Sequence, residues 1–205
     1  MSVYSVKPAK TALLIVDAQE EYFAPDGALY TPNSETIREN LVALREGASE
    51  ARLLTVFIAH GHRSSGVDVG RMGDFDETEV FTDGSVGTQV IADLRVGPDD
   101  VVVRKSRYSA FVGTELESIL RGNDIDTVVV AGMMTQYCSV TTARHAHDLD
   151  YRVIFVVDAN AGPDLPDVGW GAVSHSDSLR VIATMLAAGV ADVQTTATVL
   201  EQMKG

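Results

Sequence analysis

The sequence predicts an α/β fold in which a mostly parallel sheet of about six strands lies between two layers of helices. Short apolar runs alternate with longer amphipathic stretches along the whole chain, the pattern of right-handed β–α–β crossovers. The runs are continuous and rich in β-branched residues, as expected for parallel strands buried on both faces. No repeat or linker divides the 205 residues, so we expect a single domain spanning residues 1–205.

Each element is predicted from its own pattern, taken in chain order. The apolar runs predict strands at residues 12–16, 53–59, 101–103, 127–131 and 153–157, and a weaker one at 190–195. Apolar residues at helical spacing predict helices at residues 34–51, 87–94, 113–121, 137–149 and 176–188.

Two connections are long, one from His60 to about Val86 and one from Asn160 to about Val173. Long loops in compact domains are usually functional, and the first leaves the carboxyl end of a strand, where ligands bind in open parallel sheets. We therefore predict that it contributes to a ligand site; a surface excursion is the alternative.

Composition excludes several classes of function. The 16 Lys and Arg residues against 29 Asp and Glu residues give a net charge of −13, which disfavours nucleic-acid and anionic-membrane partners. No apolar run approaches the ~20 residues of a membrane span, and the first residues lack the apolar core of a signal peptide. Cys138 is the single cysteine, so an intramolecular disulfide is impossible. We expect a cytoplasmic protein.

Common cofactor and hydrolase motifs are absent. The first strand is followed by DAQEE, which has no glycine, and the chain contains neither a GxxxxGK[ST] loop nor a GxSxG elbow. Aspartyl phosphatases usually carry a second acid two residues after the nucleophile, but this position is Gln19. Nucleotide cofactors and these hydrolase classes are therefore disfavoured.

Three ionisable residues follow predicted strands, namely Asp17, Lys105 and Cys138. The carboxyl ends of parallel strands meet at one edge of a sheet, so these residues can form a set of base, cation and nucleophile. Lys105 is one of four lysines, and the other three lie near the termini. Each residue also has a structural explanation, as a turn cap, a solvated charge or a small core residue.

Three segments resemble the isochorismatase-like cysteine hydrolases. They are LLIVDAQEEYF (residues 13–23), VVRKSRYSAFVGTELESILR (102–121) and DTVVVAGMMTQYCSVTTARHAHDLDYRVIFVVDANAG (126–162). The resemblance implies the Rossmann-like fold of that family and a catalytic triad of Asp17, Lys105 and Cys138. It also implies a non-proline cis peptide at Met133–Met134, with the N–H groups of Met134 and Cys138 forming an oxyanion hole.

The residue types suggest the chemistry. Members of the resembled family that cleave the vinyl ether of isochorismate lack the cysteine. The presence of Cys138 therefore favours hydrolysis of a C–N bond in an amide, ureido or carbamoyl compound, similar to the reactions of the N-carbamoylsarcosine, ureidoacrylate and biuret amidases. Cys138 would form a thioester while Asp17 moves the protons. We expect Lys105 and a helix N-terminus to lower the pKa of the thiol.

Predicted substrate contacts are Phe23, His60, Arg107 and Tyr137. Arg107, or alternatively Arg63 or Arg71, would hold a substrate carboxylate; a role of Arg107 in supporting the fold is equally open. The sequence predicts no metal and no other cofactor, although His60 and His62 lie two residues apart on a strand, a spacing that can direct both side chains to one ion.

Three alternatives remain open: a nicotinamidase-like metal-assisted amidase, a non-catalytic binding protein and a redox-sensing thiol protein. We also predict a homo-oligomer, a dimer or tetramer. This prediction depends on apolar Leu165, Val168 and Trp170 in the second long loop. The helix predicted at 137–149 also has a face of small residues, which can pack on the chain's own sheet or on another subunit. These residues are Ser139, Thr142, Ala143 and Ala146.

Overall fold

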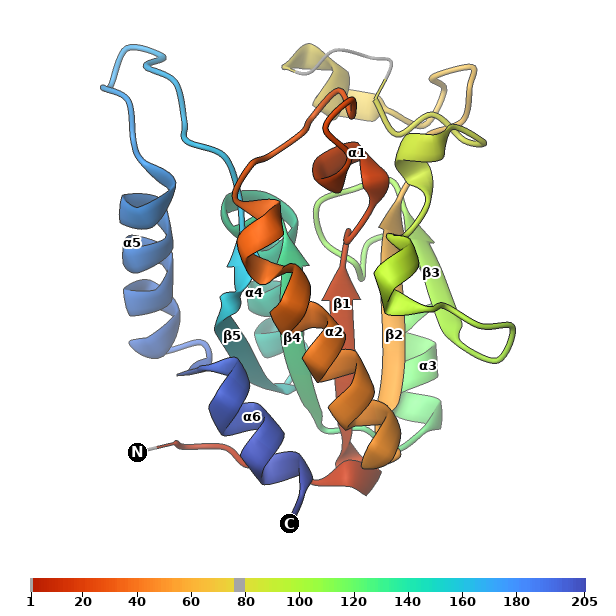
Figure 1. Cartoon of the computed structure of the whole chain (residues 1–205), viewed down its shortest axis with the longest axis vertical. Coiled ribbons are helices and arrows are strands. Elements are labelled where there is room, and N and C mark those ends of the chain that lie inside the picture. Colours follow the sequence, from red (N-terminus) through yellow and green to blue (C-terminus); the bar gives the residue numbers. More distant parts are fainter. Residues whose placement is uncertain (1, 76–79) are drawn as a thin grey trace.

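The computed structural model describes residues 2–75 and 80–205, and its core is a six-stranded sheet (Figure 1). The strand order is β3-β2-β1-β4-β5-β6, and every neighbouring pair is parallel. The strands are β1 (Thr11–Val16), β2 (Leu54–His60), β3 (Val101–Lys105), β4 (Thr127–Met133), β5 (Arg152–Ala161) and β6 (Asp192–Gln194). The predicted α/β class is confirmed, and all six predicted strands are present.

Helices cover both faces of the sheet (Figure 1). One face packs against α2 and α6, and the other against α3, α4 and α5, which gives two separate apolar clusters. The helices are α1 (Glu20–Phe23), α2 (Ser34–Glu50), α3 (Leu116–Gly122), α4 (Val140–Asp148), α5 (His175–Ala187) and α6 (Thr196–Met203). The short α1 and α6 were not predicted.

The central strand β1 illustrates why the apolar runs form this sheet. All its residues are buried, and alternate side chains enter opposite clusters, with Leu13 and Ile15 on the α2 side and Leu14 and Val16 on the α4 side. A strand with helices on both faces needs apolar residues at successive positions, so its sequence does not alternate.

The helix predicted at residues 87–94 is wrong. Two short 3-10 turns, Val86–Thr88 and Ala92–Leu94, lie there instead. Between them, Gln89 accepts a hydrogen bond from the Glu20 N–H, and the Ile91 N–H donates to Ala18. The stretch is extended because its backbone pairs with the segment that follows β1, and this long-range pairing outweighs the local helical pattern.

The small-residue face of the predicted helix at 137–149 packs inside the chain. Ser139, Thr142, Ala143 and Ala146 are all buried, and Ala143 and Ala146 belong to the cluster beneath α4. This face therefore packs against the chain's own sheet. In contrast, Val168 and Trp170 lie on the segment between β5 and α5, and 80% and 94% of their surfaces are exposed.

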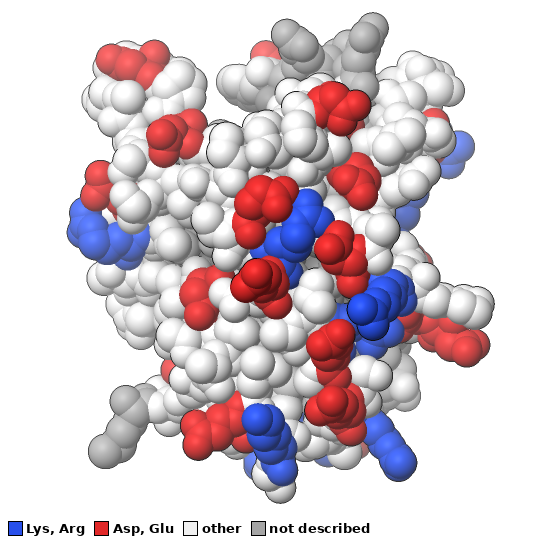
Figure 2. Space-filling model, viewed as in Figure 1, with Lys and Arg blue, Asp and Glu red and all other residues white. Residues whose placement is uncertain are grey.

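Acidic side chains outnumber basic ones on the face that α2 and α6 cover (Figure 2). On α2, Arg38 forms ion pairs with Glu35 at 2.9 Å and with Asp93 at 2.7 Å. Among the described residues, no helix has both the length and the apolar character needed to cross a membrane.

Candidate active site

Asp17 begins the site directly after β1. Its backbone is left-handed, with φ of +47°, a conformation that Asp tolerates better than most residues. Its N–H donates to the Ile58 carbonyl at 2.9 Å, which holds this turn against β2. The carboxylate is completely buried, so it requires a charged or hydrogen-bonding partner.

Lys105 is that partner, at the end of β3. The parallel register places it beside His60, the last residue of β2. Its Nζ lies 2.7 Å from Asp17 Oδ2, 3.2 Å from Cys138 Sγ and 2.8 Å from His60 Nδ1. An ammonium has three hydrogens, and this geometry provides one contact for each. We call Asp17, His60, Lys105 and Cys138 the polar cluster.

Cys138 reaches the cluster from a wide π-helical turn, Thr135–Ser139, between β4 and α4. Just before this turn, the Met133–Met134 peptide bond is cis, as predicted. Gly132 precedes that bond with φ of +129°, and a Cβ there would lie 1.9 Å from the Val16 carbonyl oxygen. Glycine is therefore required where β4 passes β1, next to Asp17.

Burial dominates the electrostatics of the cluster. It raises the pKa of the Asp17 carboxyl, although the charge of Lys105 opposes this shift. It also raises the pKa of the Cys138 thiol, and Asp17 adds to the effect. The expected lowering of the thiol pKa is therefore wrong, because removal from water outweighs the attraction of Lys105. Burial opposes the ammonium as well, but Asp17 and Cys138 raise the pKa of Lys105 overall.

His62 extends the cluster through His60, and the protonation of both imidazoles follows from Lys105. A charged ammonium only donates, so His60 Nδ1 accepts and His60 Nε2 carries the proton. His60 Nε2 lies 2.9 Å from His62 Nε2, which must then accept. Burial lowers the pKa of both imidazoles, so both are neutral near pH 7.

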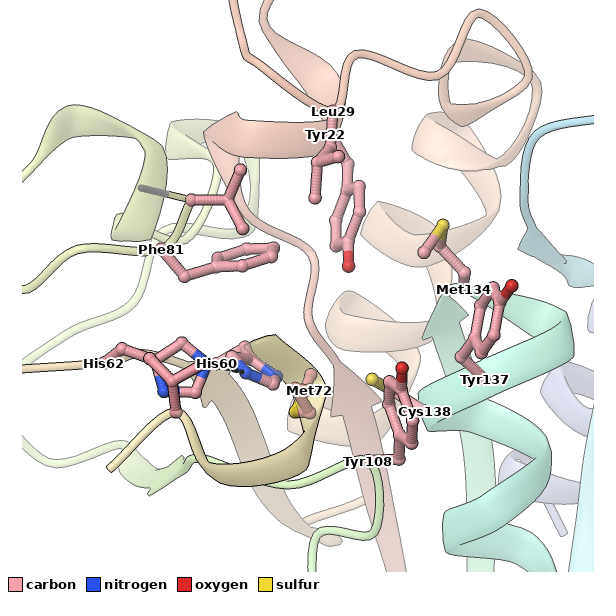
Figure 3. Close-up of a pocket in the computed structure, with 12 residues that line it drawn as sticks. Tyr22, Leu29, His60, His62, Met72, Phe81, Tyr108, Met134, Tyr137 and Cys138 are labelled. Carbon is pink, nitrogen blue, oxygen red and sulfur yellow. Dashed lines mark hydrogen bonds between the residues drawn. The ribbon is translucent and has the colours of Figure 1, made fainter. Parts of the chain in front are cut away.

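A cavity of about 50 Å³ opens beside Cys138, several times the ~10–15 Å³ that one water needs. Figure 3 shows His60, His62 and Phe81 on one side and Met134 and Tyr137 on the other, with Tyr22 directed between them. Besides Cys138 and the two histidines, its lining is Tyr22, Leu29, Val69, Met72, Val80, Phe81, Tyr108, Met134 and Tyr137. We call these nine residues the apolar wall.

The isochorismatase domain model matches residues 11–198. The chain belongs to the isochorismatase family. Its structure superposes on a cysteine hydrolase from Pseudomonas syringae pv. phaseolicola 1448A with a TM-score of 0.96 and 35% identity, over 100% of this chain and 97% of that one.

Two curated relatives of this isochorismatase-family chain are amidohydrolases. Nicotinamidase 3 of Arabidopsis thaliana is 31% identical over 73% of this chain and 72% of its own. The ureidoacrylate amidohydrolase RutB of Pseudomonas savastanoi pv. phaseolicola is 28% identical over 78% and 74% of the two chains. The chain is a hydrolase of this family.

Of the four predicted substrate contacts, His60 and Tyr137 line the cavity of this hydrolase, but Phe23 and Arg107 do not. Phe23 turns into the core, where Arg38 covers its ring. The Arg107 guanidinium donates to the carbonyls of Asp68 and Ser106 at 2.6 and 2.5 Å. The structural role left open for Arg107 therefore agrees with its contacts.

Most of the wall was missed by sequence reasoning. The members that were missed come from the segment after β1, from the long loop after β2 and from the segment after β3, whereas Met134 and Tyr137 follow β4. They share neither a motif nor a periodicity. The one available signal was the length of the loop after His60, which contributes Val69, Met72, Val80 and Phe81.

The donor set of a nicotinamidase-like metal site is incomplete among the described residues. His60 and His62 bring two nitrogens within 2.9 Å, but among the described residues no Cys, Asp or Glu joins both of them. Asp17, His60 and Cys138 do offer ligand atoms within 4.8 Å of one another. The ammonium of Lys105 contacts all three, so a cation already occupies their centre.

Proposed function

We propose that this isochorismatase-family hydrolase cleaves the C–N bond of a small amide, ureido or carbamoyl compound through a thioester on Cys138. The observation that supports this most strongly is the Lys105 ammonium, which contacts a buried carboxylate and a buried thiol at once. The nucleophile faces a small cavity, and a base and a fixed charge lie behind it, without any bound metal being required.

Asp17 is the proton carrier in this proposal. Its carboxylate lies within 4.8 Å of Cys138 Sγ, and its raised pKa makes it a stronger base than an exposed aspartate. Because the thiol pKa is also raised, the resting sulfur is protonated, and the thiolate forms when Asp17 accepts this proton during attack on the carbonyl.

Sγ then bonds to the carbonyl carbon, and the carbonyl oxygen becomes an oxyanion. The N–H groups of Met134 and Cys138 are the proposed donors to it. When the tetrahedral intermediate collapses, the C–N bond breaks and Asp17 returns its proton to the leaving nitrogen. Water, deprotonated by Asp17, attacks the thioester, and the carboxylic acid leaves with the thiol restored.

A panel of small amides, ureides and carbamoyl compounds, assayed for ammonia and acid release, tests this proposal. We expect at least one compound to release ammonia in a reaction that requires Cys138. Peroxide inactivation that thiols reverse, with no turnover of any compound, would instead favour the redox-sensing alternative.

The metal-assisted amidase is the second candidate, and the short distance between His60 Nε2 and His62 Nε2 favours it. Dialysis against a strong chelator distinguishes the two. We expect unchanged activity. Activity lost to the chelator and restored by zinc, manganese or iron would make these histidines ligands.

We also propose that the chain forms a homo-oligomer through the segment that carries Val168 and Trp170, since both are highly exposed apolar residues. Sedimentation should show a species of at least twice the chain mass of 21.9 kDa, and a monomer at micromolar concentration would refute this. The predicted single domain and cytoplasmic location stay predictions.

A further inference from the structure

The cavity combines the apolar wall with two members of the polar cluster, His60 and Cys138. The charges of that cluster, on Asp17 and Lys105, are paired with each other. Five of the nine wall residues are Leu, Val or Met, and four are aromatic. The only other lining side chains are those of Cys138 and two neutral histidines. No Lys, Arg, Asp or Glu lines the cavity among the described residues.

The cations nearest the cavity are already engaged. The Lys105 ammonium already contacts Asp17, Cys138 and His60. The Arg107 guanidinium binds two backbone carbonyls, and Arg104 pairs with Asp83 at 2.8 Å. A substrate carboxylate would have to break one of these contacts to find a partner.

Two other arginines were candidates for holding a carboxylate. The side chain of Arg71 is 94% exposed and pairs with Asp74 at 3.1 Å, and that of Arg63 is 67% exposed. Neither lines the cavity. The sequence of residues 76–79, which the structure does not describe, is DETE and contains no basic residue.

We propose that the acyl part of the substrate is uncharged and apolar, and that this cavity rejects carboxylate-bearing amides and ureides. The inference rests on the proposed amidohydrolase function and narrows it. A carboxylate enclosed by Leu, Val, Met, Phe and Tyr side chains loses its hydration and gains no counter-ion, because a tyrosine hydroxyl carries no positive charge. An aliphatic or aromatic acyl group instead removes its own apolar surface and that of the wall from water.

A matched pair of amides tests this selectivity. In 4-methylpentanamide, an isopropyl group takes the place of the carboxylate of succinamate, with nearly the same shape. For the wild-type protein we expect kcat/KM to be at least about 100-fold higher for 4-methylpentanamide, because one buried polar mismatch can produce discrimination of this size. Equal or faster turnover of succinamate would overturn the inference.

Binding to the Cys138→Ala variant separates this inference from the proposed chemistry. Calorimetry should show 4-methylpentanamide binding at least about 100-fold more tightly than succinamate. If binding is selective but wild-type protein releases no ammonia, the amidase proposal fails and the cavity inference stands. Succinamate binding as tight as that of 4-methylpentanamide, or binding of neither amide, would overturn the cavity inference.

A substitution in the apolar wall tests whether the lack of a positive charge there causes the selectivity. Leu29 lines the cavity and is only half-buried, so Leu29→Arg can bring a guanidinium to the opening. We expect this variant to bind succinamate at least tenfold more tightly than wild type, while the matched control Leu29→Met keeps the original preference. An unchanged preference in Leu29→Arg, with the fold intact by thermal unfolding, would contradict the role of wall charge.

Discussion

The apolar wall and two members of the polar cluster, His60 and Cys138, line the same cavity, but different parts of the chain build the cluster and the wall. Asp17, His60 and Lys105 lie at the ends of three adjacent parallel strands, whose register fixes their separations. The wall comes largely from irregular segments, such as the loop that carries Val69 and Met72. The sheet therefore sets the position of the reacting groups, and the loops set the shape and polarity of what reaches them.

This difference has a consequence for substitutions. A change in the cluster alters charge or proton transfer among fully buried groups, where an unpaired charge or polar atom is costly. A change in the wall alters the apolar contact area between wall and substrate, and its effect increases with the area lost. We therefore expect cluster variants to lose kcat and wall variants mainly to raise KM.

The largest effect is expected for Cys138→Ala and Asp17→Asn. Each should lower kcat by at least about a thousandfold, because the nucleophile and the proton carrier act as one unit. Ammonia release measures the loss, and thermal unfolding shows whether the fold persists. A Cys138→Ala protein with a substantial fraction of wild-type activity would end the thioester mechanism.

Lys105 comes next. Lys105→Ala should lower kcat by about a hundredfold or more and also destabilise the fold, since it leaves the fully buried Asp17 carboxylate without its counter-ion. Lys105→Arg should not restore activity, because a planar guanidinium cannot direct hydrogens to Asp17, Cys138 and His60 from one centre. Near-wild-type activity in Lys105→Arg would show that charge alone suffices.

Alkylation by iodoacetamide tests the raised thiol pKa of the cluster. The thiolate is the reactive form, so labelling should be slow at pH 7 and rise about tenfold per pH unit until the thiol pKa is passed. Because Cys138 is the only cysteine, intact-protein mass reports it directly, and Cys138→Ala is the unlabelled control. Rapid labelling that is already constant at pH 7 would show a lowered pKa.

The smallest effect is expected in the wall. Val69→Ala removes two methyl groups from the cavity lining and should raise KM for an apolar amide by about three- to tenfold, with kcat nearly unchanged. Steady-state kinetics give both parameters. A loss confined to kcat would mean that Val69 positions the polar cluster, so the two regions would not act separately.

The same comparison explains which parts of the site the sequence predicts. Asp17 directly follows an apolar run, and Lys105 follows another after Arg104. A parallel sheet brings such ends together, so the cluster follows from pattern and topology. The same reasoning offered Cys138 as the nucleophile. The family resemblance added that the three residues form a catalytic triad, and it added the cis bond at Met133–Met134, which the structure contains.

The remaining features depend on long-range packing. Phe81 and Tyr22 are 5.2 Å apart between ring centroids, but no local pattern relates their positions in the sequence. The thiol pKa was predicted in the wrong direction because the sequence reveals the charged neighbours of Cys138 and not its complete burial. Residues 87–94 were predicted as a helix from their local pattern of apolar residues. Their pairing with residues 18–20 is a tertiary contact, which no local pattern reveals.

The thioester on Cys138 is the central claim, and trapping it with hydroxylamine is the most direct test. An acyl-enzyme transfers its acyl group to hydroxylamine, so a turned-over amide should give the hydroxamate along with ammonia, and Cys138→Ala should give neither. Ammonia and carboxylic acid formed by wild-type protein in concentrated hydroxylamine, with no hydroxamate, would indicate direct attack by water and contradict the account.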